Sequence, residues 1–144
     1  MALRGFSFYT DAIFYFMVYS SLIALVALLA IDLVWIGVIA RAWYAKWLGD
    51  LMAAKFSLAP AALFYVLYAI GISYFVVQPA VAAGSAVSTV FMRGAFLGLL
   101  AYATYDLTNQ ATLRHWPVTL TIVDMAWGAL LTGVVATIAY LVVR

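Results

Sequence analysis

The feature that most constrains this chain is an apolar run over residues 12–40, which only Ser20, Ser21 and Asp32 interrupt. An α-helix rises about 1.5 Å per residue, so this run is longer than the hydrocarbon core of a bilayer, which is about 30 Å thick. The whole chain is 69% hydrophobic and 8% charged, whereas a soluble domain carries about 25% charged residues. A soluble fold of this size is therefore excluded, and we expect an integral membrane protein.

Four apolar segments are long enough to be membrane spans, and together they fill most of the chain. We predict helices over about residues 12–40, 60–78, 86–111 and 117–143. Pro60 suits the first turn of the second helix, and Pro79 is expected to end that helix. Because the connection over residues 112–116 is short, the third and fourth helices should be antiparallel neighbours. The predicted fold class is an all-α membrane protein, a four-transmembrane-helix bundle in one domain over residues 1–144.

The segment over residues 41–58, between the first two spans, mixes charged and aromatic side chains. Lys46 lies between Trp43 and Trp47, and apolar residues recur near helical spacing. Tryptophan rings favour the headgroup region of a bilayer, and lysine side chains extend from it towards water. We therefore expect an amphipathic helix that lies in the membrane interface.

Basic residues set the expected orientation. The loops after the first and third spans hold four of them, and the opposite side holds three: Arg41, Lys46, Lys55 and Arg114 against Arg4, Arg93 and Arg144. The positive-inside rule then places both termini on the non-cytoplasmic side. The first apolar stretch exceeds the roughly 7–15 residues of a signal-peptide core, so it should remain as the first span.

Three aspartates lie inside the apolar spans: Asp32, Asp106 and Asp124, here called the aspartate layer. Counted from the nearest span ends, each lies roughly 12 Å below the same membrane surface, so they share one depth if they face inward. An ionised Asp in mid-membrane costs about 2.5–3.5 kcal/mol, which makes each a candidate for a functional site. Arg93 is about 20 Å from Asp106 along the same helix and is not a counter-ion. We expect at least one aspartate to hold a proton at neutral pH, or the layer to hold a cation.

Polar and aromatic neighbours accompany the aspartate layer. Tyr105 and Asn109 share a helix face, and Asn109 follows Asp106 by three residues. Trp35 and Trp127 follow Asp32 and Asp124 by three residues and are expected to wall a pocket. The candidate ligand or proton site therefore comprises Asp32, Asp106, Asp124, Asn109, Tyr105, Trp35 and Trp127. Hydrogen-bond partners for the aspartates are also expected among Tyr102, Thr104, Thr108 and Thr121.

A purely structural interpretation competes with this site. Interhelical hydrogen bonds between polar groups hold membrane helices together at about 1 kcal/mol each, and the three aspartates could serve only that purpose. The two tryptophans could equally anchor the interface or contact lipid. A stripe of small residues, Gly94, Gly98 and Ala101, is expected to let another helix approach the third span closely.

Residue types for other chemistries are scarce. The chain has no cysteine, and its one histidine, His115, lies at a helix end, so no metal centre is predicted. No phosphate-binding glycine loop and no nucleophile elbow is present. The sequence names no cofactor, and it lacks the basic cluster of a nucleic-acid-binding protein.

Four segments of the chain resemble one known family. The longest is AYATYDLTNQATLRHWP over residues 101–117, accompanied by DLVWIG over 32–37, ALFY over 62–65 and DMAWG over 124–128. Together they resemble the family catalogued as domain of unknown function 2177 (DUF2177), with Gln110 in place of an expected apolar residue. The resemblance implies a four-span, multi-pass protein of the bacterial inner (cytoplasmic) membrane but no activity. It marks as pattern positions Asp32, Trp35, Asp106, Asn109, Asp124 and Trp127.

Two classes of function fit these observations. In the first, the aspartate layer helps to bind, transport or modify a lipophilic small molecule or a membrane lipid, as proton acceptor, proton donor or cation ligand. In the second, the protein is a non-catalytic accessory subunit of a larger respiratory or photosynthetic membrane complex, or a homo-oligomer. A proton or cation pathway is a weaker alternative, because the opposite half offers few polar side chains: Ser20, Ser21, Ser73 and Thr132. The sequence decides neither the substrate nor whether the protein is an enzyme.

Overall fold

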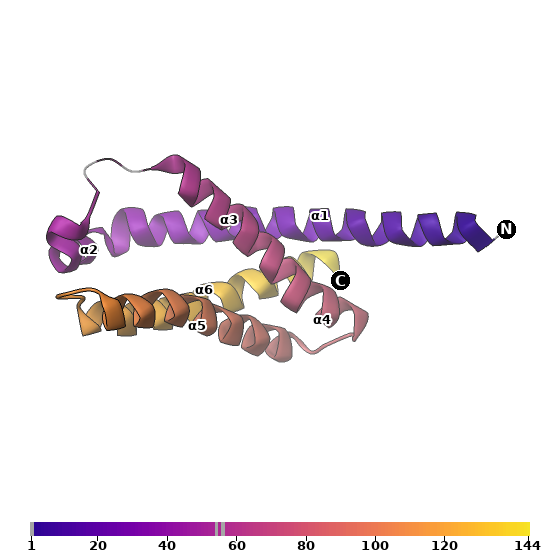
Figure 1. Ribbon diagram of the computed structural model, residues 1–144. Helices are drawn as coiled ribbons and strands as arrows, with labels where there is room; N and C mark the ends of the chain where they lie inside the picture. The colour runs from indigo at the N-terminus through magenta and orange to yellow at the C-terminus, as the bar shows by residue number, and fades with distance from the viewer. Residues whose placement is uncertain (1, 54, 56) are drawn as a thin grey trace.

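The molecule consists of helices that pack side by side (Figure 1). The computed structural model describes residues 2–53, 55 and 57–144; the side chain of Arg4 and residues 54 and 56 of the expected amphipathic segment lie outside the described part. Its candidate membrane spans are Ile13–Ile39, Leu58–Ala82, Val87–Thr112 and Val118–Val143. The described residues contain no strand. The predicted all-α membrane protein with four transmembrane helices is therefore confirmed.

The first span belongs to a longer helix whose N-terminal end projects beyond the bundle (Figure 1). α1 (Ala2–Val34) continues as a π-helical turn, η1 (Trp35–Ile39), and after a bend at Ala40 the chain forms α2 (Arg41–Leu48). Gly49, with φ 48°, ends α2, and a short 3₁₀ turn, η2 (Gly49–Leu51), follows. A positive φ suits glycine and interrupts a regular helix. Helix α2 is therefore shorter than the amphipathic segment expected over residues 41–58.

The second span continues through Pro79, where we expected it to end. It consists of α3 (Leu58–Ile72), a π-helical turn η3 (Ser73–Val77) and α4 (Gln78–Ala82). In a regular α-helix, the ring of Pro79 would meet the carbonyl group of Phe75, one turn earlier. The wider η3 turn, in which the Gln78 N–H bonds to the Ser73 carbonyl, makes room for the ring. The prediction that Pro79 ends the span was wrong for this reason.

The third and fourth spans pack against each other along much of their length (Figure 1). They are α5 (Val87–Thr112) and α6 (Val118–Val143). A Cβ atom added at Gly94 would lie 2.9 Å from the Thr132 carbonyl oxygen, and one added at Gly98 would overlap the Gly128 carbonyl oxygen. Only glycine permits this approach, so the predicted close contact at the small-residue stripe is confirmed, with α6 as the partner.

The apolar core occupies the half of the bundle away from α2. It is formed where α1, α3, η3, α4, α5 and α6 meet, and its fully buried side chains include Leu28, Ile72, Leu131 and Val135. Lipid tails are as apolar as these side chains, so little of the bundle's stability comes from removing the side chains from water. Close packing of the side chains against one another contributes more. The aspartates lie at the other end of the bundle.

Candidate functional site: the aspartate layer

All three intramembrane aspartates are buried at the end of the bundle that carries α2 (Figure 1). The exposed fraction is 2% for Asp32 on α1, 0% for Asp106 on α5 and 8% for Asp124 on α6. α1 and α5 end at this side of the molecule, and α6 begins there. The alternating directions of the spans therefore bring together carboxyl groups that are far apart in the sequence.

Asp32 accepts hydrogen bonds from two other helices. The Tyr65 hydroxyl on α3 donates to Oδ2 at 2.8 Å, and the Trp127 indole Nε1 on α6 donates to Oδ1 at 2.9 Å. Both donors are neutral, so they stabilise a carboxylate without cancelling its charge. These two bonds tie α1 to α3 and α6 at the level of the layer.

Asp124 is hydrogen-bonded to helix α2. The Tyr44 hydroxyl donates to Asp124 Oδ1 at 2.5 Å, and Trp35 Nε1 donates to the same Tyr44 oxygen at 3.2 Å. Burial, together with the hydrogen bond to Asp124, raises the pKa of Tyr44 above its ordinary value. The hydroxyl therefore stays protonated and keeps donating to Asp124 at neutral pH.

Trp35 and Trp127 stack face to face. Their ring centroids are 4.2 Å apart and their planes differ by 9°. Each ring also uses its N–H group, Trp35 towards Tyr44 and Trp127 towards Asp32. The stacked pair thus connects the hydrogen bonds of Asp32 with those of Asp124 in one network.

Asp106 differs from the other two aspartates. Among the described residues, neither of its carboxyl oxygens has a hydrogen-bond partner, although the side chain is fully buried. One turn further along α5, Oε1 of Gln110 is a second buried acceptor without a partner. Asp106 also lies within electrostatic range of Asp124. A buried carboxylate without a donor or counter-ion is costly, so Asp106 requires a proton or a donor from a bound molecule.

The aspartate layer is acidic and lacks a cationic partner in the part of the chain that the structure describes. No Lys or Arg side chain there forms an ion pair with Asp32, Asp106 or Asp124. The described His, Asp and Glu side chains also form no group of three or more that could hold a metal ion. The layer therefore combines acidic acceptors with neutral Tyr and Trp donors.

Two of the candidate residues lie outside this network. Tyr105 is 58% exposed, and its ring packs edge-on against Trp116 with centroids 5.8 Å apart. Asn109 is half-buried and pairs with Tyr105 rather than with Asp106. The structure thus brings together Asp32, Asp124, Trp35 and Trp127, places Asp106 beside them, and leaves Tyr105 and Asn109 on another face of α5.

The hydrogen-bond partners expected for the aspartates were wrong in three cases. Thr104 and Thr108 donate to backbone carbonyl groups of their own helix, and Thr121 accepts a hydrogen bond from Trp116. The hydroxyl groups of Thr104 and Thr108 find their nearest acceptor in the preceding turn of their own helix, so they are not directed to the aspartates.

The actual donors, Tyr44 and Tyr65, were not selected from the sequence. Tyr65 is the last residue of the ALFY segment, and Tyr44 lies between Trp43 and Trp47. These positions alone give at most a weak indication of the hydrogen bonds. Tyr44 and Asp124 are 80 residues apart in the sequence, and Tyr65 and Asp32 are 33 residues apart. No local spacing rule predicts such pairs.

Comparison with known proteins identifies the family of this chain. Residues 9–141 match the family described as predicted membrane protein (DUF2177). The matched range includes the three aspartates and the donors Tyr44 and Tyr65. No curated protein and no solved structure matches the chain. Because the match covers nearly the whole length, the chain belongs to the DUF2177 family of predicted membrane proteins.

Proposed function

We propose that the protein binds a lipophilic molecule whose polar end carries hydrogen-bond donors, such as hydroxyl or amine groups, at the aspartate layer. The observation that carries this proposal is the fully buried carboxyl group of Asp106, which has no partner among the described residues. Such a group lowers the stability of a protein, and a ligand that donates to it would offset that cost.

The chemistry of the layer selects the class of ligand. Its carboxyl groups accept hydrogen bonds when ionised, and they would repel an anionic head group. Asp32 lies seven residues before the end of the first span at Ile39, roughly 10 Å along the helix. The polar end of the ligand would therefore lie just below the headgroups and its apolar body among the lipid tails, as a long-chain alcohol or amine would be placed.

Helix α2 is the element best suited to open the layer. None of its eight residues is buried. Its contacts with the layer include the hydrogen bonds of the Tyr44 hydroxyl to Asp124 and Trp35, and the edge-on packing of Trp43 against Trp35, with centroids 6.1 Å apart. An element with few buried contacts separates at low cost, so α2 would act as a cover that moves aside when the ligand enters.

The test is to identify the molecules that the purified protein retains. Wild-type protein and Asp106→Asn would be purified from membranes in mild detergent, extracted and analysed by mass spectrometry. Asp11→Asn, the same change outside the spans, is the matched control. We expect the wild type and the control to retain one donor-bearing amphiphile, and Asp106→Asn to retain it about tenfold less or worse, since a charge-assisted hydrogen bond contributes about 1.5–3 kcal/mol. Equal retention by Asp106→Asn would contradict the proposal.

The accessory-subunit alternative gives a different result in the same purification. A subunit of a larger complex would purify with other proteins, and that assembly would survive Asp32→Asn, Asp106→Asn and Asp124→Asn. A small particle or a homo-oligomer that holds the amphiphile favours the binding site instead.

We also infer an orientation, with the aspartate layer towards the cytoplasmic face of a bacterial inner membrane and both termini on the other side. This is supported by the position of α2, with Arg41 and Lys46, at the same end as Arg114 in the α5–α6 turn (Figure 1). Because the chain has no cysteine, single cysteines introduced by Leu113→Cys and Arg144→Cys can be labelled in intact cells with an impermeant maleimide. We expect label on the Arg144→Cys variant alone; the reverse pattern would overturn the orientation.

A further inference from the structure

A groove lies at the opposite membrane surface from the aspartate layer, between α1 and the end of the second span. Its volume is about 740 Å³, and its lining includes Ile13, Phe16, Tyr74, Phe75, Gln78 and Pro79. Ile13 is the first residue of the first span, and Ala82 is the last residue of the second. Tyr74 is 57% exposed and Phe75 65% exposed, so this groove opens towards lipid.

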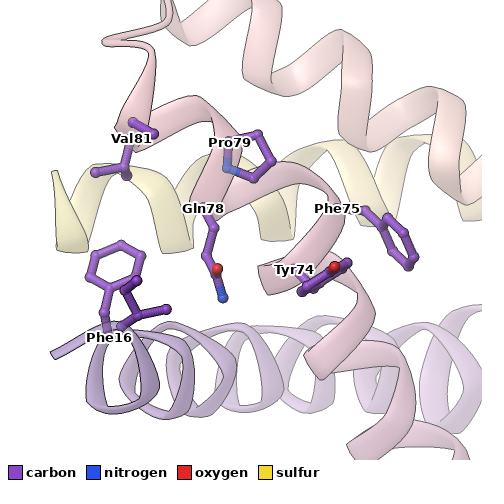
Figure 2. A pocket seen from close by; sticks show the side chains of 8 residues that line it. Phe16, Tyr74, Phe75, Gln78, Pro79 and Val81 are labelled. Atoms are coloured by element: carbon purple, nitrogen blue, oxygen red, sulfur yellow. The ribbon is translucent and has the colours of Figure 1, made fainter. Parts of the chain in front are cut away.

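Gln78 supplies a polar group in this otherwise apolar and aromatic groove. Figure 2 shows its side chain extending from α4 towards α1, between Phe16 and Tyr74. Its Nε2 atom is buried and has no hydrogen-bond partner among the described residues. A buried N–H donor without an acceptor costs about 1–3 kcal/mol, so a molecule that brings an acceptor into the groove would be bound preferentially.

The depth of Gln78 identifies the acceptor. Gln78 lies four residues before the end of its span at Ala82, roughly 6 Å along the helix. This depth is the boundary between hydrocarbon core and headgroups, where the ester carbonyl groups of phospholipids lie. The groove-lining residues carry no charge, so they provide no selection for the charge of a head group.

We propose that this groove binds a diacyl phospholipid of the leaflet opposite the aspartate layer. An ester carbonyl oxygen of the lipid accepts a hydrogen bond from Gln78 Nε2, and the acyl chain below it lies against Phe16 and Tyr74. Lipid held only through its acyl chains would not distinguish an ester from an ether linkage. Lipid in this groove is distinguished by its dependence on the ester carbonyl group.

Native mass spectrometry of the purified protein tests this dependence. The protein would be equilibrated with an equal mixture of a diester phospholipid and a diether phospholipid that have the same head group and chain length. We expect the wild type to retain the diester several-fold more than the diether. Equal retention of the two lipids by the wild type would overturn the proposal without any substitution.

Two variants test whether the preference for the diester lipid depends on Gln78. Gln78→Leu should retain both lipids equally, whereas Thr137→Val, whose hydroxyl bonds to Gly133 of its own helix, should keep the wild-type preference. A preference that survives Gln78→Leu would overturn the assignment.

Independently, a diester lipid with a diazirine on its acyl chain should label Phe16 or Tyr74 in the wild type more than Met92, which is exposed on α5. Equal labelling of α1, η3 and α5 would show that the groove is an ordinary lipid contact and not a binding site.

Discussion

The two ends of the bundle use polar groups in different ways. At the end that carries α2, acidic groups and their Tyr and Trp donors link four elements, and Asp106 is left without a partner. In the opposite half, neutral groups pair with each other: Ser20 with Ser73 at 2.5 Å, and the Tyr140 hydroxyl with the Ser85 carbonyl at 2.6 Å. Paired neutral groups hold helices together, whereas a buried acid without a partner does not. In the opposite half, Ser21 Oγ and Gln78 Nε2 are the exceptions to this pairing among the described residues. The paired groups there contribute to stability, and the aspartate end is the proposed binding site.

The largest expected effect comes from the α5–α6 contact on which both halves depend. Gly98→Ala places a Cβ atom onto the Gly128 carbonyl oxygen, so the two helices must separate. We expect the free energy of unfolding in detergent to fall by about 3 kcal/mol. Gly71→Ala, with nothing within 4 Å of the added atom, is the control, and it should change stability by less than about 1 kcal/mol. Similar results for the two variants would contradict the close packing.

The second effect concerns the partnered acids. Asp32→Ala removes the acceptor of both Tyr65 and Trp127. Leaving two partly buried donors without an acceptor should lower the free energy of unfolding by about 2 kcal/mol. The same measurement on Ser88→Ala, at an exposed position on α5, should show little change. If Asp32→Ala is as stable as the wild type, the network does not hold α1, α3 and α6 together.

A smaller effect is expected for the link between α2 and the layer. Tyr44→Phe removes the hydrogen bond to Asp124 and the acceptor for Trp35. We expect a loss of about 1 kcal/mol and faster proteolysis within residues 41–51, because α2 is released. Tyr74→Phe, at an exposed lipid-facing position, is the control. Unchanged proteolysis in Tyr44→Phe would show that α2 is held by other contacts.

Loss of a polar pair in the opposite half should lower the free energy of unfolding still less. Ser73→Ala removes the bond between the Ser20 and Ser73 hydroxyls, and such interhelical bonds average about 0.6 kcal/mol. Ser88→Ala, at an exposed position, serves as its control. If Ser73→Ala lowers the free energy of unfolding as much as Asp32→Ala does, the two halves do not differ in this way.

Sequence reasoning succeeded where the controlling property is local. The spans follow from apolar length, and the close contact at Gly94 and Gly98 follows from side-chain size. The path through Pro79 could not be predicted in this way, because it depends on the π-helical turn before it, and periodicity does not reveal such a turn.

The candidate site was predictable only in part. Burial of Asp32, Asp106 and Asp124 follows from the cost of exposing a carboxyl group to lipid. Their partners depend on how the helices pack and on the bend at Ala40, which lets Tyr44 reach Asp124. The contrast between two satisfied acids and one unsatisfied acid is a property of the assembled bundle, so no reading of the chain alone distinguishes Asp106.

The most direct test of that contrast is the thermal unfolding of the wild type and the three Asp→Asn variants, measured side by side in the same detergent after any bound amphiphile has been removed, so that ligand binding does not add to the stability of the wild type. Asparagine keeps the shape of aspartate and removes its charge. Asp32→Asn and Asp124→Asn should unfold at lower temperature than the wild type, because each weakens a hydrogen bond to a buried carboxylate. Asp106→Asn, which has no such bond to lose among the described residues, should unfold at the same temperature or higher. A fall for Asp106→Asn as large as that for Asp32→Asn would contradict the account.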